Sequence, residues 1–234
     1  SFRDKGKRIY LIANVATHPD YRRRGIARIL TQRAMEHAYK KNATAIWLHV
    51  RDDNPGAIKL YSDLGFQEIA RRTNWQANPD SSFPKPDSDI QIVPRHPRFW
   101  IQQQDWLRRL YPDVLTWYQP LNLTALTPGL INWLYSLFMD FNIKQWAAVS
   151  KRDGDNLLAT LSWMPQGGRV EAIYGATADR VDDNAEALTQ LLIHVRRALS
   201  NHSRLALDFP AGEMTEAITA ADFKPLRTLI WMRA

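Results

Sequence analysis

The stretch IYLIANVATHPDYRRRGIA, residues 9–27, joins an apolar run to a basic turn and then to the start of a helix. The apolar residues 9–16 predict a strand, and three arginines at 22–24 precede Gly25. Backbone N–H groups at a helix start favour an anion, and a glycine lets the backbone approach it closely. Ala27 adds little bulk there, so the stretch is typical of a phosphate-binding turn. Taken alone, these residues favour a solvated surface turn over a phosphate site.

The residues around this stretch predict an alternating β-α-β-α-β order. The expected elements are a strand over 9–16, a helix over 25–41, a strand over 45–51, a helix over 55–64 and a strand over 66–71. Helical spacing predicts a buried stripe on the first helix made of Ile26, Leu30, Ala34 and Ala38. Charged residues lie between these positions, so we expect this helix to pack on a sheet with its charged face in solvent.

Residues 77–89 contain three prolines and few apolar residues, which predicts an exposed linker near a domain boundary. We therefore expect two domains, residues 1–94 and 95–234. The elements expected after the linker are helices over 106–111 and 128–140, a hairpin of 145–150 and 157–163, a strand over 169–176, a helix over 184–200, a strand over 205–209, a helix over 213–221 and a strand over 226–232. The second part ends in the same β-α-β-α-β order as the first, which predicts an α/β protein with an internal structural repeat.

Composition excludes several classes of protein. At about 150 residues per domain, 234 residues correspond to one large domain or two small ones. The 45% hydrophobic and 24% charged residues are those of a globular chain. The absence of cysteine excludes disulfides, thiolate zinc sites and cysteine nucleophiles, and it fits a reducing, cytoplasmic location. No apolar segment reaches the roughly 18 residues of a membrane span, so no membrane partner is expected. The six histidines show no metal-ligand spacing, and no metal is expected.

Positive charge is concentrated in the first third of the chain. Residues 1–75 contain 15 basic and 7 acidic side chains, a net charge of +8, and the remainder carries −1, which together give the overall +7. Such a field attracts nucleic acid, an acidic protein or a phosphorylated cofactor. Charge alone does not choose among these partners.

Two motifs in this third resemble the GNAT N-acetyltransferase superfamily. The pattern Arg22-x-x-Gly25-x-Ala27 is similar to its pyrophosphate-binding signature, and NPGAIKLYSDLGF at 54–66 resembles its Asn-x-x-Ala-x-x-Leu-Tyr-x-x-x-Gly-Phe helix. More narrowly, WLHVR at 47–51 and RRTNW at 71–75 resemble the protein N-terminal amine acetyltransferases, including the type that acts on ribosomal proteins. The resemblance covers about residues 9–75 and implies acetyl-CoA as co-substrate and a primary amine as acceptor.

The resemblance also implies roles for particular residues. The backbone of the fourth strand of the family pairs with the pantetheine arm of the co-substrate, and the matching residues are Val15, Ala16 and Thr17. The turn Arg22, Arg23, Arg24, Gly25, Ile26 and Ala27 would hold the pyrophosphate. Asn54 matches an asparagine that bonds the pantetheine, although an asparagine before Pro-Gly is also a good helix cap.

Tyr61 matches the family's tyrosine next to the CoA sulfur, and a phenol with a pKa near ~10 can give a proton to a departing thiolate at neutral pH. His49 alternates with Leu48 and Val50 along its strand, so it faces the other side and could activate an amine. An imidazole of pKa ~6.5 suits an α-amine of pKa ~8 better than a lysine at ~10.4. A half-buried core aromatic is the alternative for Tyr61, and a structural strand histidine is the alternative for His49.

The resemblance leaves a gap, because a complete GNAT domain has strands and two helices before its fourth strand. Here only residues 1–8 precede that strand. We expect the first unit to lack these N-terminal elements, either because the chain is a fragment or because another segment or subunit fills their place. The tryptophan-rich helical region after residue 99 is expected to pack in the core or at an interface, with an apolar or peptide groove as the alternative.

The second unit lacks the co-substrate motifs. Its counterpart of the phosphate turn, residues 177–184, has no glycine and three carboxylates, so this turn is expected to repel a pyrophosphate and the unit to act as a scaffold.

The sequence therefore predicts an acetyl-CoA-dependent N-acetyltransferase acting on a peptide N-terminal α-amine or on a small-molecule amine. Two classes without this activity also fit the sequence, an idle acyl-CoA-binding module and a nucleic-acid or ribosome-binding protein. The retained Tyr61 argues against the idle module, and the lack of an aromatic stacking platform beside the basic residues argues against nucleic acid.

Overall fold

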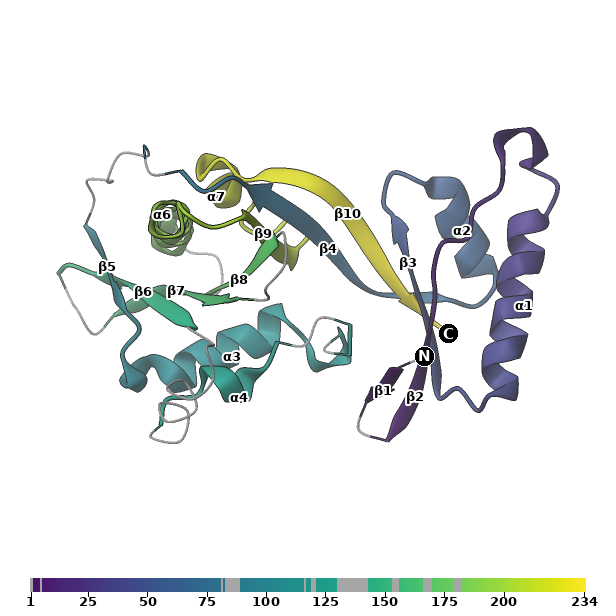
Figure 1. The fold of residues 1–234 in the computed structure, drawn as a ribbon, viewed down its shortest axis with the longest axis horizontal. Coiled ribbons are helices and arrows are strands. Elements are labelled where there is room, and N and C mark those ends of the chain that lie inside the picture. The colour runs from purple at the N-terminus through teal and green to yellow at the C-terminus, as the bar shows by residue number, and fades with distance from the viewer. Residues whose placement is uncertain are drawn as a thin grey trace. The chain divides into compact units, whose positions relative to one another are not determined.

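A computed structural model describes residues 2–4, 6–80, 82, 89–115, 117–118, 121–129, 143–152, 156–165, 170–178 and 182–234. The chain divides into two compact units, Ser1–Arg72 with Arg227–Ala234, and Thr73–Leu226. In both units helices pack on a mixed β-sheet (Figure 1). Among the described residues, no helix has the length and apolar character needed to cross a membrane.

The first unit has the expected β-α-β-α-β order. Its elements are β1 (Phe2–Asp4), β2 (Lys7–Ile12), α1 (Ile26–Lys40), β3 (Ala45–Arg51), α2 (Pro55–Asp63), the beginning of β4 (Gln67–Ala77) and the end of β10 (Lys224–Arg233). The strand order is β1-β2-β3-β10-β4. β1 and β2 form an antiparallel hairpin, β2 and β3 run parallel, and β10 pairs antiparallel with β3.

The first predicted strand was too long. β2 ends at Ile12, four residues before the expected end at Ala16. Asn14 has a φ of 59°, in the left-handed region, which is incompatible with an extended strand. The parallel pairing with β3 accordingly stops at the pair Ile12↔Leu48, while β3 continues to Arg51.

The predicted buried stripe of α1 was partly wrong. Ala38 is buried, but Leu30 is 47% exposed and Thr31 is fully buried instead. The Thr31 hydroxyl donates to the Ala27 carbonyl at 2.8 Å, so the polar group is satisfied inside the helix. The apolar spacing therefore identified the helix but not its rotation. The buried face of α1 joins a core cluster that also contains Leu48, Val50, Tyr61, Phe66, Ile230 and Met232.

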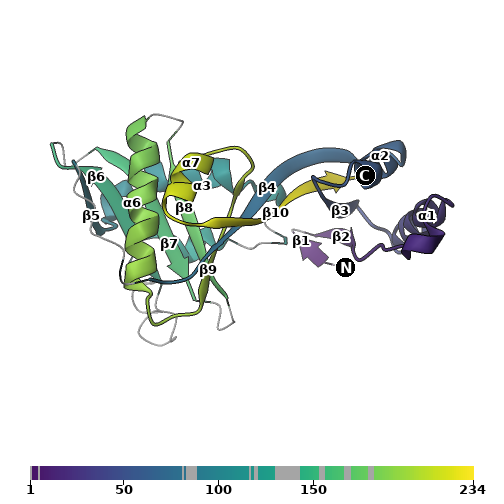
Figure 2. The ribbon, with the colours of Figure 1, turned by 90° about the horizontal axis from the view of Figure 1, so that it is seen from above.

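The second unit is built on the remaining strands. Its elements are the end of β4, β5 (Ile90–Pro94), α3 (Trp100–Leu110), α4 (Leu123–Leu126), β6 (Lys144–Ser150), β7 (Leu157–Met164), β8 (Val170–Thr177), α6 (Asp182–Ala198), β9 (Arg204–Pro210), α7 (Thr215–Ala220) and the start of β10. The strand order is β4-β9-β8-β7-β6-β5. Helices α6 and α3 lie on opposite faces of these strands (Figures 1 and 2).

Most elements expected in the second unit are present. The β6–β7 hairpin is antiparallel as predicted, and β8, α6, β9, α7 and β10 follow in the expected order. The helix predicted over 106–111 was too short, because α3 begins at Trp100. Strand β5 and helix α4 were not predicted, and the helix expected over 128–140 lies largely outside the described residues. The expected core packing of tryptophans is confirmed for Trp106 and Trp163, which lie in the main cluster.

Candidate active site

The chain leaves strand β2 and reaches helix α1 through residues 13–25. Val15, Ala16 and Thr17 have no regular secondary structure and no strand partner among the described residues. The buried hydroxyl oxygen of Thr17 likewise has no hydrogen-bond partner in the described part of the chain. The Thr17 hydroxyl is therefore available to a ligand that lies along this segment.

The predicted phosphate turn forms the end of this segment. Gly25 is the N-cap of α1 with a φ of 76°, and Arg23 is also left-handed at 63°. A Cβ built on Gly25 would meet nothing within 4 Å, so the φ requirement and not crowding favours glycine there. Ile26 and Ala27 begin the helix, and their N–H groups have no intrahelical acceptor. The turn thus presents backbone donors at the positive end of α1.

The three arginines of the turn are exposed. Arg22 makes a long hydrogen bond from Nε to the Thr17 carbonyl, at 3.4 Å. The Arg24 guanidinium lies 5.2 Å from the ring centre of Tyr21. No ion pair joins these arginines to a carboxylate within the described residues, and the turn keeps a positive charge that suits a phosphate.

Asn54 is the N-cap of helix α2. Its side-chain oxygen accepts a hydrogen bond from the Ala57 N–H at 3.1 Å, and Pro55 occupies the first helical position. The capping role weighed for this residue is confirmed. A role in binding stays a prediction, because the same exposed side chain still has its amide donors.

Tyr61 lies on the buried side of α2, where its ring makes an edge contact with Phe66 at 6.2 Å between centroids. Burial raises the pKa of the phenol above its ordinary value of 10. The hydroxyl therefore holds its proton throughout the neutral range and can only donate it there. Its neighbours in the core cluster include Leu48 and Val50 of β3.

His49 lies on the opposite face of β3 from Leu48 and Val50, as the alternation predicted. Its ring lies 5.0 Å from that of Trp231, and the two residues are paired across β3 and β10. Burial, followed by the positive charge of Arg227, lowers the pKa of His49 below 6.5. The imidazole is therefore neutral at pH 7 and can accept a proton.

Tyr61 and His49 are thus separated by the backbone of β3 rather than brought into contact. The pairing of β2 with β3 ends at Ile12↔Leu48, so His49 lies just beyond it along β3. Trp231 and Arg227 were not identified from the sequence, because no local pattern indicates that a strand about 180 residues away pairs with β3.

The first part of the chain is similar to known acetyltransferases. Residues 1–66 match the acetyltransferase (GNAT) family. Over 81 residues the chain is 36% identical to the ribosomal protein bS18-alanine N-acetyltransferase of Escherichia coli (strain K12), covering 35% of this chain and 53% of that relative. It is also 38% identical over 80 residues to GCN5-related N-acetyltransferase 4, chloroplastic, of Arabidopsis thaliana, covering 28% of it. The chain therefore spans about half or less of these relatives.

Solved structures resemble a larger part of the chain. A GCN5-related N-acetyltransferase from Sphaerobacter thermophilus aligns with a TM-score of 0.55 at 15% identity, over 93% of this chain and 70% of that one. A tandem GNAT protein from the clavulanic acid biosynthesis pathway aligns with a TM-score of 0.52 at 17% identity, over 98% and 75%. At these identities the similarity concerns the fold, which is a mixed α/β GNAT-like fold.

Proposed function

We propose that this chain is part of an N-acetyltransferase that moves an acetyl group from acetyl-CoA to a primary amine. The observation that carries the proposal is the segment between β2 and α1. There, strand pairing stops at Ile12, the Thr17 hydroxyl has no partner among the described residues, and a left-handed Gly25 caps a helix beside three exposed arginines. The family match over residues 1–66 covers this same segment.

The residues present fit acetyl-CoA. The Gly25 turn offers N–H groups and positive charge for a pyrophosphate, with open space where a side chain would stand. The unpartnered Thr17 hydroxyl oxygen, in the segment that also contains Val15 and Ala16, suits an amide-bearing arm. Acetyl-CoA, when bound, supplies an activated thioester carbonyl. Asn54, at the start of α2, would donate to the same arm through its side-chain amide.

The two titratable residues have complementary protonation states. Tyr61, whose pKa burial raises, would act as general acid and give its proton to the departing sulfur. His49, whose pKa burial and Arg227 lower, would accept a proton from the amine directly or through water. A base of this strength suits an α-amine, whose own pKa is near ~8. This supports the N-terminal α-amine of a peptide or protein as the acceptor, as in the bS18 enzymes, and a small-molecule amine is the second candidate.

We further propose that the chain contains two GNAT-like units in tandem, corresponding to the two compact units Ser1–Arg72 with Arg227–Ala234 and Thr73–Leu226. Helix α6 follows β8, and α7 follows β9, as α1 follows β2 and α2 follows β3. The second unit would act as a scaffold for the first, because its sequence over 177–184 lacks glycine and carries three carboxylates. Thr177 ends β8, residues 179–181 lie outside the described residues, and α6 begins at Asp182.

The test combines binding with turnover. Calorimetric titration of the chain with acetyl-CoA should give one site per chain, and two sites would refute the scaffold role of the second unit. Release of free CoA should then be followed with an Ala-initiated peptide, the same peptide with its α-amine acetylated, and a small primary amine. Turnover with the free peptide alone supports the α-amine acceptor. Binding without any turnover would leave an acyl-CoA-binding module, and no binding would refute the proposal.

A further inference from the structure

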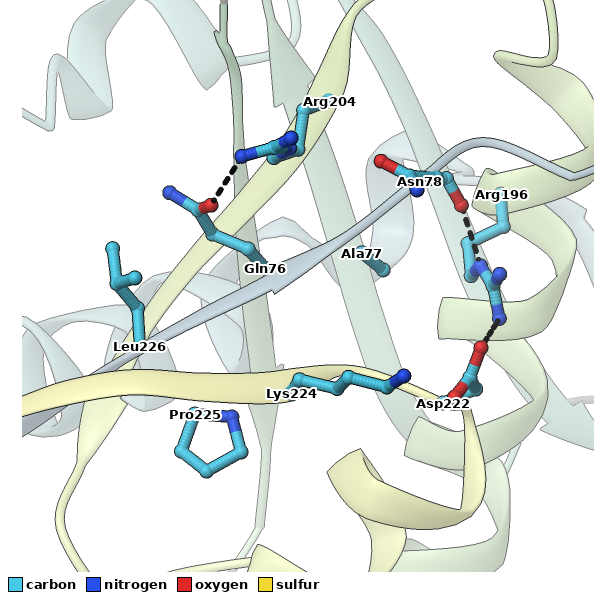
Figure 3. A pocket seen from close by; sticks show the side chains of 9 residues that line it. All are labelled: Gln76, Ala77, Asn78, Arg196, Arg204, Asp222, Lys224, Pro225 and Leu226. Carbon is cyan, nitrogen blue, oxygen red and sulfur yellow. Dashed lines mark hydrogen bonds and ion pairs between the residues drawn. The ribbon is translucent and has the colours of Figure 1, made fainter.

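The second unit has a pocket of about 250 Å³ that none of the proposed chemistry uses (Figure 3). Three segments form it: the end of β4, the last turn of α6 with the start of β9, and the turn after α7 with the start of β10. The lining residues are Gln76, Ala77, Asn78, Arg196, Arg204, Asp222, Lys224, Pro225 and Leu226. At ~30 Å³ per water, the volume corresponds to roughly eight waters, which is enough for a small organic molecule.

One wall of the pocket is a buried arginine whose bonds are all directed to the protein. The side chain of Arg196 is 4% exposed. Its Nε donates to the Asn78 carbonyl at 2.8 Å and its Nη1 to the Ala221 carbonyl at 3.0 Å. Nη1 also lies 3.3 Å from Asp222, and Nη2 lies 3.9 Å from Asp80. Arg196 therefore fixes the wall, and the Asp222 carboxylate is neutralised by it.

The other two cations of the pocket are not neutralised in this way. Arg204 donates from Nη1 to the uncharged Gln76 side-chain oxygen at 3.3 Å, and in the described part of the chain it makes no ion pair. Lys224 makes neither a hydrogen bond nor an ion pair through its side chain with any described residue, and Figure 3 shows that side chain running along the pocket with its amine on the side of Asp222. Two positive charges thus face a concave, partly apolar space that includes Ala77, Pro225 and Leu226.

The pocket is at the wrong end of the strands to be a second co-substrate site. β8 and β9 run parallel, with Val170 opposite Arg204 at the start of both strands. The turn that would correspond to the phosphate turn follows Thr177, at the far end of β8. At ~3.3 Å per residue, the eight-residue strand separates the two places by roughly 23 Å.

We propose that this pocket binds a small organic oxyanion, with the carboxylate or phosphate group at Arg204 and Lys224 and a short apolar body against Pro225 and Leu226. Guanidinium and ammonium groups without a carboxylate partner favour such a group, since charge-assisted bonds are the stronger ones. The uncharged Gln76 oxygen on Arg204 is easily displaced by an anion. Arg196 needs no new partner and would keep its structural bonds in the complex.

The test uses the full chain and two probes, inorganic phosphate and butyrate, titrated by calorimetry and by NMR. Saturable binding is expected, and Arg204→Gln and Lys224→Gln should each weaken it about tenfold or more. Lys151→Gln, which removes an exposed lysine of the same unit, should not change it. Gly25→Glu should also leave it unchanged, because that substitution affects only the acetyl-CoA turn.

Either of two results would overturn the proposal. One is the absence of saturable binding of both probes up to about 10 mM. The other is binding that Arg204→Gln and Lys224→Gln leave intact, which would indicate an adventitious ion only. Both side chains are at the surface, so melting temperatures close to that of the unmodified chain will show that the variants are folded. Because Gly25→Glu separates the two sites, failure here says nothing against acetyl-CoA binding.

Discussion

His49 of β3 and Trp231 of β10 face each other across an antiparallel pair, with ring centroids 5.0 Å apart and planes at 57°. The ring of Trp231, itself 3% exposed, therefore packs against the imidazole. The last strand of the chain thus completes the surroundings of a candidate base in the first unit. It also supplies Arg227, whose positive charge adds to the effect of burial on that base.

The environment of His49 predicts how the reaction rate depends on pH. A neutral His49 is required to accept a proton, so kcat/KM should fall as the pH falls through the lowered pKa of His49, at a pH below 6.5. Arg227→Gln removes one cause of the lowering, and the acid limb should move to higher pH. The measurement is a pH–rate profile together with an NMR titration of the imidazole. Arg33→Gln, on the exposed side of α1, serves as a charge-matched control. A limb that moves equally in both variants would contradict the assignment.

Tyr61→Phe tests the proposed general acid. The variant keeps the ring and its contact with Phe66 but loses the proton, so kcat should fall by ~10² or more while acetyl-CoA affinity stays within a few-fold. Steady-state turnover and calorimetry measure the two quantities separately. Unchanged turnover would remove Tyr61 from the mechanism.

Gly25→Glu tests the phosphate turn. The substitution forces a side chain into a left-handed conformation, at a cost of about 1–3 kcal/mol, and places a carboxylate where the pyrophosphate would lie. Acetyl-CoA binding should be abolished in a calorimetric titration. Gly6→Glu is the matched control, since Gly6 also has a positive φ, of 80°, and open space around it. Normal acetyl-CoA affinity in Gly25→Glu would refute the site.

Arg196→Ala tests the buried wall of the second unit. Removing the guanidinium leaves the Asn78 and Ala221 carbonyls without their hydrogen-bond donors. The free energy of unfolding should therefore fall by about 2–4 kcal/mol. Arg152→Ala removes an exposed arginine paired with Asp89 and should cost less than about 1 kcal/mol. Urea unfolding of both variants provides the comparison. Equal losses of unfolding free energy in the two variants would show that the burial of Arg196 adds nothing to stability.

Three elements of the first unit could be predicted closely from the sequence, whereas β1 was not predicted and β4 is six residues longer at its end than expected. β3 has the predicted bounds, and α1 and α2 agree to within one residue at each end, because Gly25, Asn54 and Pro55 are strong helix-start signals. Strand β2 was overextended because nothing in an apolar run shows that Asn14 takes a left-handed conformation. Strand β5 was missed because its five residues follow a proline-rich segment without clear alternation.

Long-range pairing could not be predicted in the same way. The site residues on β2, α1 and α2 follow from motifs that are local in sequence, whereas the neighbours of His49 come from β10. Pairing of β3 with β10 depends on a register set by packing, and neither strand encodes its partner. The rotation of α1, with Thr31 inside and Leu30 outside, likewise depends on the surface it packs against.

The insertion of β10 next to β3 also has a consequence for how the chain is made. β3 and β4 are synthesised long before β10, which follows β4 by roughly 150 residues. At ~5–20 residues per second, this separation corresponds to about 7–30 s of translation. During that interval the nascent first unit exposes the strand edge that β10 later occupies, and such edges invite aggregation. Chaperone holding of the nascent chain, or early docking of a substitute strand, would protect it until synthesis is complete.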